Sequence, residues 1–237
     1  MSHPALRGDH HVHSTFSDDA VSTLEENVGA AAAAGLATVR LVDHVRQSTT
    51  WVPEYLAAVR RLRVPEGLTV LTGVEAKILD VSGELDIPSL PRGIDRILIA
   101  DHQFPGVDGP LGPTAVRERM AAGWAAADVL DQFVDAVIAT MRRHPGNQLA
   151  HCFSILPKIG LTEGELGAER LDAWARAAAE TGTLVEVNEK WVCPGAEALT
   201  ALERAGAGIV ASTDSHAAAD VGRYSRIVPL LEPSEGR

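Results

Sequence analysis

Side chains able to bind metal or transfer protons recur at the carboxyl ends of seven short, β-prone runs of the sequence. They include six of the nine histidines. The residues at these positions are His11, His13, Asp43, His44, Glu75, His102, His151, Glu186, Asn188, Asp214 and His216. The carboxyl ends of parallel strands meet at one face of a sheet, and active sites are built there. We therefore expect these residues, far apart in sequence, to line one cleft.

The most specific element is the sequence His11-Val-His13. Because side chains alternate along a strand, both rings point to the same side and can reach one ion. A single histidine such as His44 or His102 is, taken alone, more often a hydrogen-bonded structural residue. The gathering of six histidines at strand ends favours a shared metal site over that structural alternative.

The pattern around these residues predicts a parallel α/β fold. Ala-rich helical stretches alternate with the β-prone runs, and no Ser/Gly/Pro-rich linker divides them, so we expect a single domain over residues 1–237. Seven strands are too few for a full eight-stranded barrel. The predicted strands are Gly8–His11, Ala37–Val42, Leu68–Val74, Ile94–Ala100, Gln148–His151, Thr183–Val187 and Gly208–Ala211.

Several helix boundaries can also be predicted. Ser22-Thr-Leu-Glu25 matches a capping box, and Gly35 is placed to end the helix that follows. The segment 113–143 is long enough for more than one helix. The polar tail from about residue 232 is expected to fray.

Composition excludes several classes of protein. The chain has 32 acidic and 21 basic residues, a net charge of −11, which disfavours stable nucleic-acid binding. Its two cysteines exclude a disulfide scaffold and a cysteine-based zinc ribbon, so a bound metal would need nitrogen and oxygen ligands. No signal peptide or membrane span is indicated, which predicts a cytoplasmic protein without a membrane partner. The oligomeric state is left open.

Together, the motifs resemble those of the PHP (polymerase and histidinol phosphatase) superfamily, most closely its stand-alone bacterial phosphatases. The resemblance spans residues 8 to about 224, in the family's order. The segments that carry it are Gly8-Asp-His-His-Val-His-Ser-Thr-Phe-Ser-Asp-Asp-Ala20, Val42-Asp-His44, Gly73-Val-Glu-Ala-Lys-Ile-Leu-Asp-Val-Ser-Gly-Glu-Leu-Asp-Ile-Pro88, Ala150-His151, Glu186-Val-Asn188 and Ser212-Thr-Asp-Ser-His216.

This resemblance implies a distorted (β/α)7 barrel with two to three divalent ions at the carboxyl ends of the strands. Mixed imidazole and carboxylate ligands suit Zn, Mn or Fe. The implied ligands are His11, His13, Glu75 and Asp214 for a first ion, Glu75 as a bridge to a second held by His102 and His151, and His44 with His216 for a third.

The sequence departs from the family pattern at two positions. Asp19 stands where some relatives have the last histidine of the third site, so we expect Asp19 to be an oxygen ligand. The neighbouring Asp18 is the alternative, since a small shift of the loop would bring its carboxylate to the same place. Asp101 precedes His102, where a small hydroxyl residue is usual, and is either a solvated loop residue or a partner that orients His102. Cys152 is expected to be a buried apolar residue rather than a thiolate ligand.

The expected activity is metal-dependent hydrolysis of a small phosphorylated metabolite by a metal-bridging hydroxide, as in histidinol-phosphate phosphatase. Glu75 would act through the metals, and Asp43 or His216 would donate a proton to the leaving group. Basic residues near the motifs are candidates for binding the phosphate, namely Arg46, Lys158, Lys190 and Arg223. A phosphodiesterase acting on nucleotide or cyclic phosphates is the second interpretation, and a non-catalytic metal-binding or interaction protein is the third.

Overall fold

Seven parallel strands form one sheet, in the order in which they occur along the chain. The computed structural model describes residues 3–232, so the tail predicted to fray from about residue 232 lies, apart from Glu232, outside the described residues. All seven predicted strands are present, with small shifts at their ends. They are β1 (Gly8–Val12), β2 (Thr38–His44), β3 (Thr69–Lys77), β4 (Arg96–Ala100), β5 (Gln148–Ala150), β6 (Leu184–Asn188) and β7 (Ile209–Ser212).

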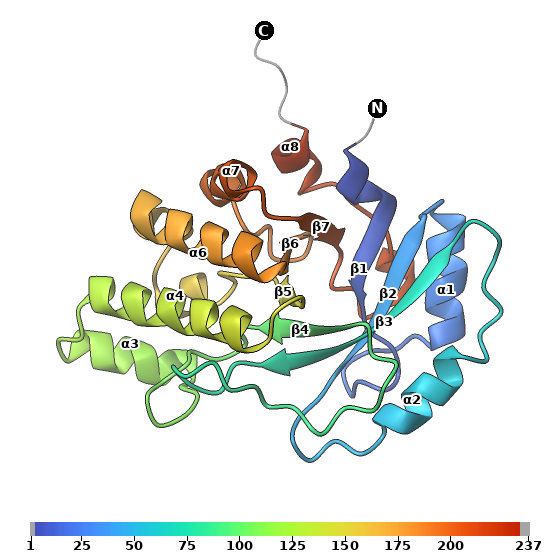
Figure 1. The fold of residues 1–237 in the computed structure, drawn as a ribbon, viewed down its shortest axis with the longest axis horizontal. Helices are drawn as coiled ribbons and strands as arrows, with labels where there is room; N and C mark the ends of the chain where they lie inside the picture. Colours follow the sequence, from blue (N-terminus) through green and yellow to red (C-terminus); the bar gives the residue numbers. More distant parts are fainter. Residues whose placement is uncertain (1–2, 233–237) are drawn as a thin grey trace, which may run out of the picture.

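Helices pack on the outside of the sheet. In Figure 1, α1 and α2 lie on one side of the strands, and α3, α4, α6 and α7 lie on the other. The segment 113–143 forms two helices, as expected. Among residues 3–232 no helix has the length and apolar character that a membrane span requires. The helices are α1 (Leu24–Ala33), α2 (Val52–Val59), α3 (Pro113–Ala121), α4 (Ala126–Arg143), α5 (Leu156–Ile159), α6 (Gly167–Thr181), α7 (Ala196–Ala205) and α8 (Val228–Leu231), with 3-10 turns at Pro4–Arg7, Glu163–Glu165 and Ala218–Asp220.

The first and last strands meet along a seam that nearly closes the sheet. Val12 forms a parallel bridge with Ser215, and the N–H of His13 donates to the carbonyl of Ser215 at 2.9 Å. Earlier along the same two segments, the buried carboxylate of Asp9 accepts hydrogen bonds from the N–H and hydroxyl of Thr213, at 3.0 and 2.6 Å. The fold is therefore a distorted (β/α)7 barrel, and the seam brings together residues from the two ends of the chain.

Apolar packing between the sheet and the helices fixes the positions of the strand ends. Trp174 of α6 and Phe133 of α4 are fully buried in the main core. On the other side of the sheet, the hydroxyl of the buried Tyr55 in α2 donates to the carbonyl of Leu41 in β2 at 2.6 Å. Burial of large side chains is the main favourable contribution to folding. It holds the strand ends in a rigid frame.

The capping box of α1 lies one residue later than predicted from Ser22 and Glu25. The hydroxyl of Thr23 accepts a hydrogen bond from the N–H of Glu26, whose carboxylate accepts one from the N–H of Thr23. Ser22 instead accepts from the N–H of Ala218 at 2.8 Å. Both four-residue windows match the capping pattern. The contact of Ser22 with the segment after β7 decides between them.

Thr23→Ala removes the hydroxyl that caps α1. We expect the free energy of unfolding, measured by urea denaturation, to fall by about 1 kcal/mol. Thr200→Ala is the matched control, because the hydroxyl of Thr200 only bonds to the carbonyl of Ala196 within α7. Equal losses for the two variants would contradict this assignment of the cap.

Candidate metal centre

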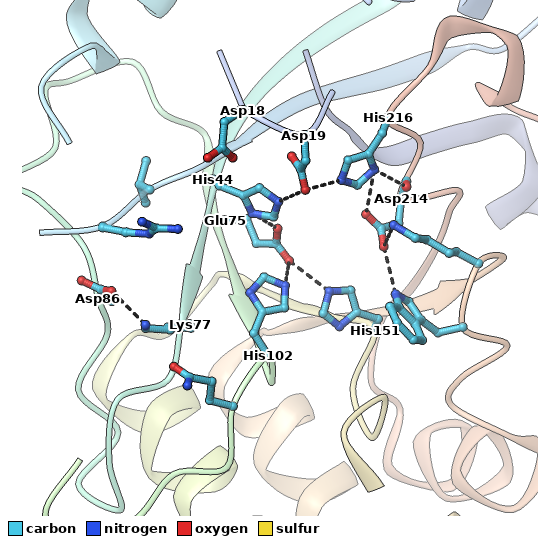
Figure 2. A pocket seen from close by; sticks show the side chains of 15 residues that line it. Asp18, Asp19, His44, Glu75, Lys77, Asp86, His102, His151, Asp214 and His216 are labelled. Atoms are coloured by element: carbon cyan, nitrogen blue, oxygen red, sulfur yellow. Dashed lines mark hydrogen bonds and ion pairs between the residues drawn. The ribbon is translucent and has the colours of Figure 1, made fainter. Parts of the chain in front are cut away.

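The nine side chains predicted to bind metal lie together at the carboxyl ends of the strands. His11 and His13 are fully buried at the base of the group. The others line a cavity of about 420 Å³, and Figure 2 shows most of them pointing toward a common centre. These cavity-lining members of the predicted set are Asp19, His44, Glu75, His102, His151, Asp214 and His216.

Glu75, at the end of β3, occupies the centre of the cluster and is 2 % exposed. Its Oε1 lies 3.0 Å from Nε2 of His151 and 3.2 Å from Nε2 of His102. The pairing of β2 with β3 sets His44 directly beside Glu75. Oε2 of Glu75 faces three further imidazoles, those of His44 at 2.8 Å, His11 at 3.5 Å and His13 at 3.6 Å.

A compact group of possible ligands forms at the seam, where the His-x-His sequence spans the end of β1. Ligand atoms of His11, His13 and Asp214 lie within 4.8 Å of one another. Oδ1 of Asp214 is 3.3 Å from Nε2 of His13 and 3.9 Å from Nε2 of His11. The expectation that both rings of His11-Val-His13 face the same side agrees with this geometry.

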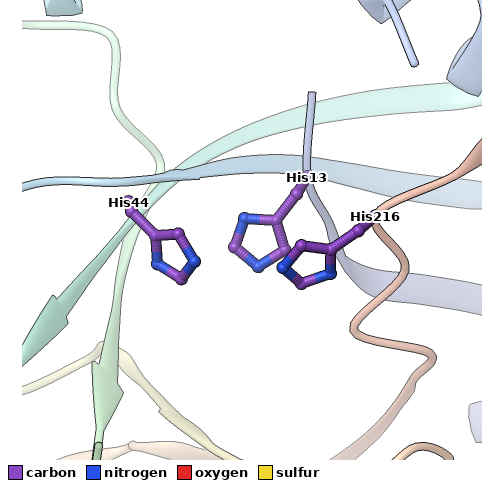
Figure 3. A group of neighbouring side chains, drawn as sticks. All are labelled: His13, His44 and His216. Atoms are coloured by element: carbon purple, nitrogen blue, oxygen red, sulfur yellow. The ribbon is translucent and has the colours of Figure 1, made fainter. Parts of the chain in front are cut away.

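A second group lies nearer the mouth of the cavity. His13, His44 and His216 bring ring nitrogens within the same 4.8 Å limit, and Figure 3 shows the three rings side by side. Asp19, whose side chain is half exposed, places Oδ2 3.4 Å from Nε2 of His44 and 3.2 Å from Nε2 of His216. Asp18 also lines the cavity. Of the two neighbouring carboxylates, only Asp19 forms ion pairs with these histidines.

Acceptors behind the cluster orient the histidine rings. Nδ1 of His11 lies 2.9 Å from Oε1 of Glu186, and Nδ1 of His151 lies 3.2 Å from Oδ1 of Asp101. An acceptor at Nδ1 assigns the proton to that nitrogen and leaves Nε2 to face the cluster, as is usual for metal-binding histidine. Sequence reasoning placed Glu186 at a strand end but gave it no role. The spacing of two residues between Glu186 and Asn188 could have indicated that both side chains face the same side of the strand as the ligand cluster.

Asp101 and Asp43 have positions that the sequence did not predict. Asp101 is buried and contacts His151 and the hydroxyl of Ser154, so neither expectation for it, a solvated residue or a partner of His102, is correct. Asp43 is also buried. Its oxygens accept from the N–H and hydroxyl of Ser14 and from the hydroxyl of Ser17, at 2.7–2.9 Å, so this carboxylate holds the loop after β1.

The charge balance of the cluster is dominated by buried carboxylates. Burial alone would raise the pKa of Glu75, but the neighbouring His102 and His11 lower it well below its usual range. Burial would likewise raise the pKa of Asp214, which the nearby imidazoles of His13 and His11 lower. Burial lowers the pKa of His13 to about 3, so its imidazole is neutral at pH 7. The ionised carboxylates and the neutral His13 are in the protonation states that metal binding needs. Burial would lower the pKa of His11 and His151, but the neighbouring carboxylates raise both, so these two imidazoles must release a proton when an ion binds.

A divalent ion fits these residues on a separate structural ground. Nε2 of His11 and Nε2 of His13 are buried and have no hydrogen-bond partner among the described residues. Buried polar atoms are rarely left unpaired, and a bound ion is one common explanation for an atom that has no partner in the protein. Two unpaired imidazole nitrogens facing the carboxylates of Glu75 and Asp214 form a nitrogen and oxygen donor set suited to Zn, Mn or Fe.

Two residues of the cluster have left-handed backbone conformations. His151 has φ of 29° and Asp214 has φ of 51°, and neither is glycine. Such conformations are unfavourable for residues with a side chain and are concentrated at functional sites. By contrast Cys152, next to His151, is buried in the apolar core as expected, and burial raises the pKa of its thiol well above the usual range.

The predicted phosphate-binding residues differ in position. Arg46 and Lys190 line the main cavity. Arg223 lines an adjoining cavity of about 390 Å³, which His216 and Asp214 share. Lys158 lies with Nζ 4.0 Å above the ring of Trp191. Sequence reasoning missed Lys77, which lines the main cavity and pairs with Asp86 at 3.5 Å, as well as Trp191 itself.

Comparison with known proteins links this geometry to one family. The PHP domain family model matches residues 9–190. A probable phosphatase of Acetivibrio thermocellus is 32 % identical over 237 residues, covering 94 % of this chain and 85 % of that protein. A probable phosphatase of Caldanaerobacter subterraneus is 27 % identical, covering 94 % and 82 %.

A solved structure has the same fold. The histidinol phosphate phosphatase of Lactococcus lactis, in complex with zinc, L-histidinol and phosphate, superposes with a TM-score of 0.66 at 16 % sequence identity. The superposition covers 97 % of this chain and 94 % of that one. This likeness supports the distorted barrel with seven strands.

Glu186→Gln keeps the shape of the side chain beneath His11 but removes its charge. We expect the affinity for divalent metal to fall by about 10–100-fold, because a neutral acceptor makes the imidazole a poorer ligand. The affinity can be measured by titrating metal-free protein with Mn²⁺ in a calorimeter. Glu163→Gln is the control, since Glu163 accepts from the N–H of Gly195 instead of an imidazole. Unchanged affinity in Glu186→Gln would show that Glu186 does not support the metal centre.

Proposed function

The chain belongs to the PHP domain family, and from that membership and its histidine-rich cavity we propose that it is a metal-dependent phosphatase acting on a small phosphorylated metabolite. The phosphatases among its relatives support a hydrolase. The observation that carries the proposal is the contact of one buried carboxylate, Glu75, with five imidazoles at the base of an open cavity.

We assign the ligands of the ions as follows. His11, His13 and Asp214 would hold one ion, His102 and His151 would hold a second, and Glu75 would be shared between the two. His44, His216 and Asp19 form a third site at the mouth. When bound, such ions supply a water nucleophile near neutral pH and neutralise the charge that develops on the phosphoryl oxygens. Two to three divalent ions per chain are therefore part of the proposal.

The remaining work falls to residues of the cavity wall. Arg46 and Lys190 offer the cations that can orient the phosphate as it enters. Of the two candidates for proton donor, His216 lines the cavity, whereas both oxygens of Asp43 are engaged by Ser14 and Ser17. His216 can donate a proton only while its Nε2 is free of a third ion, so the number of ions and the source of the proton are linked.

A chelation experiment tests the function directly. We expect hydrolysis of p-nitrophenyl phosphate to stop after thorough chelation and to return when Mn²⁺, Zn²⁺ or Fe²⁺ is added. Glu75→Gln should lower the rate at saturating metal more than His44→Ala or His216→Ala, because one carboxylate contacts both inner ligand groups. Activity that survives chelation, or a preference for bis(p-nitrophenyl) phosphate over the monoester, would contradict the proposed phosphomonoesterase.

A pair of neighbouring substitutions tests the third ion. Asp19→Ala should lower the metal content by about one equivalent and reduce turnover, because its carboxylate faces both His44 and His216. Asp19→His should keep the ion and shift the preference toward Zn²⁺. Elemental analysis of metal-supplemented protein measures the first effect. Asp18→Ala is the matched control. Full metal content in both single variants and in the double variant Asp18→Ala/Asp19→Ala would contradict the third site and restrict the proposal to the two inner ions.

A further inference from the structure

Trp191 is a large aromatic residue at the wall of the metal-binding cavity, 39 % exposed in a protein with few aromatic side chains. It follows β6, and its N–H donates to the side-chain oxygen of Asn188 at 3.0 Å. Asn188 is itself buried and donates to Glu186 at 3.2 Å. The backbone of Trp191 is therefore tied to the end of a barrel strand rather than carried on a free loop.

The indole of Trp191 contacts one of the proposed metal ligands directly. Its Nε1–H donates to Oδ2 of Asp214 at 3.0 Å. The other oxygen of the same carboxylate, Oδ1, faces Nε2 of His13 at 3.3 Å. One end of Asp214 is thus bound by the indole while the other points into the cluster. A carboxylate whose outer oxygen has a fixed donor cannot easily rotate, so its inner oxygen keeps its direction.

A second donor reaches the same oxygen but is less restrained. Nζ of Lys190 lies 3.2 Å from Oδ2 of Asp214, yet the Lys190 side chain is 45 % exposed and has four rotatable bonds. The indole, by contrast, has two rotatable bonds and is flanked by ammonium groups. Nζ of Lys158 lies 4.0 Å from its ring centre and that of Lys190 lies 5.8 Å away. Cation–π attraction to Lys158 holds the ring where its N–H meets Asp214.

We propose that Trp191 is a positioning residue that orients Asp214 for metal binding through its indole N–H. This inference rests on the proposed metal-dependent function, because it concerns a ligand of that metal centre. It also accounts for an exposed tryptophan at this point, because phenylalanine could supply the ring but not the donor at its edge. Loss of the N–H should weaken the site that contains Asp214 and leave the others intact.

Trp191→Phe tests the proposal, because it keeps an aromatic ring for Lys158 and removes only the donor edge. We expect calorimetric titration of metal-free protein with Mn²⁺ to show a loss of about 10–100-fold in affinity, confined to one class of sites. The melting temperature of the metal-free protein should stay unchanged. Trp51→Phe is the matched control, because Trp51 packs on Phe16 and Tyr55. The Trp51→Phe variant should bind every ion with the affinity of the unsubstituted protein. Lys158→Met, which keeps the indole N–H, should weaken the same class of sites by less.

The outcomes separate this inference from the function on which it rests. Wild-type affinity in Trp191→Phe, in a protein whose activity chelators still abolish, would overturn the role of Trp191 and leave the phosphatase proposal standing. Equal weakening of all sites together with a lower melting temperature would assign Trp191 a purely structural role and overturn the inference as well. If the unsubstituted chain binds no divalent ion, the proposed function itself fails.

Discussion

The carboxylate of Glu75 is almost completely removed from water and lies within 3.6 Å of five imidazole rings. An ionised group in such a place is very unfavourable unless it is paired with positive charge and hydrogen bonded. Asp214 adds a second carboxylate close by, and Glu186 a third behind His11. Protonated histidines can balance part of this charge, but His13 stays neutral at its position. Three buried carboxylates so close together favour a bound cation at this place. The packed barrel holds them near one another despite their repulsion.

Carboxylates in the layer below meet a different need. Asp9 and Asp43 are buried, and burial raises the pKa of each to about 6. Neither lines the main cavity, and both accept several hydrogen bonds from backbone and hydroxyl groups. Asp9 joins the seam between β1 and β7, and Asp43 holds the loop that carries Asp19 past the mouth. The protein therefore uses acidic residues in two ways, as groups that bind cations and as acceptors that fix the path of the chain.

The sequence was sufficient for the seven strands and for the grouping of histidines at their ends, because both follow from local periodicity and from the geometry of parallel sheets. It failed where the answer depended on contacts between distant segments. Ser22 and Thr23 match the same capping pattern, and only the contact of Ser22 with Ala218 separates them. Asp101 adjoins His102 in sequence but lies against His151 in space. Trp191 could not be assigned from sequence either, since its partner Asp214 follows the next strand.

The seam of the barrel also bears on when the protein can acquire metal during its synthesis. His11 lies in the first strand and His13 follows it directly, whereas Asp214 and His216 follow the last strand. Contacts of Val12 and Asp9 join the two ends of the sheet. A nascent chain emerging from the ribosome holds the two histidines long before the aspartate exists. Contacts so distant in sequence form late, because their loop-closure entropy must be overcome first. The proposed inner ligand group is therefore complete only when the last strand has joined the first, and an ion bound there would meet a closed barrel.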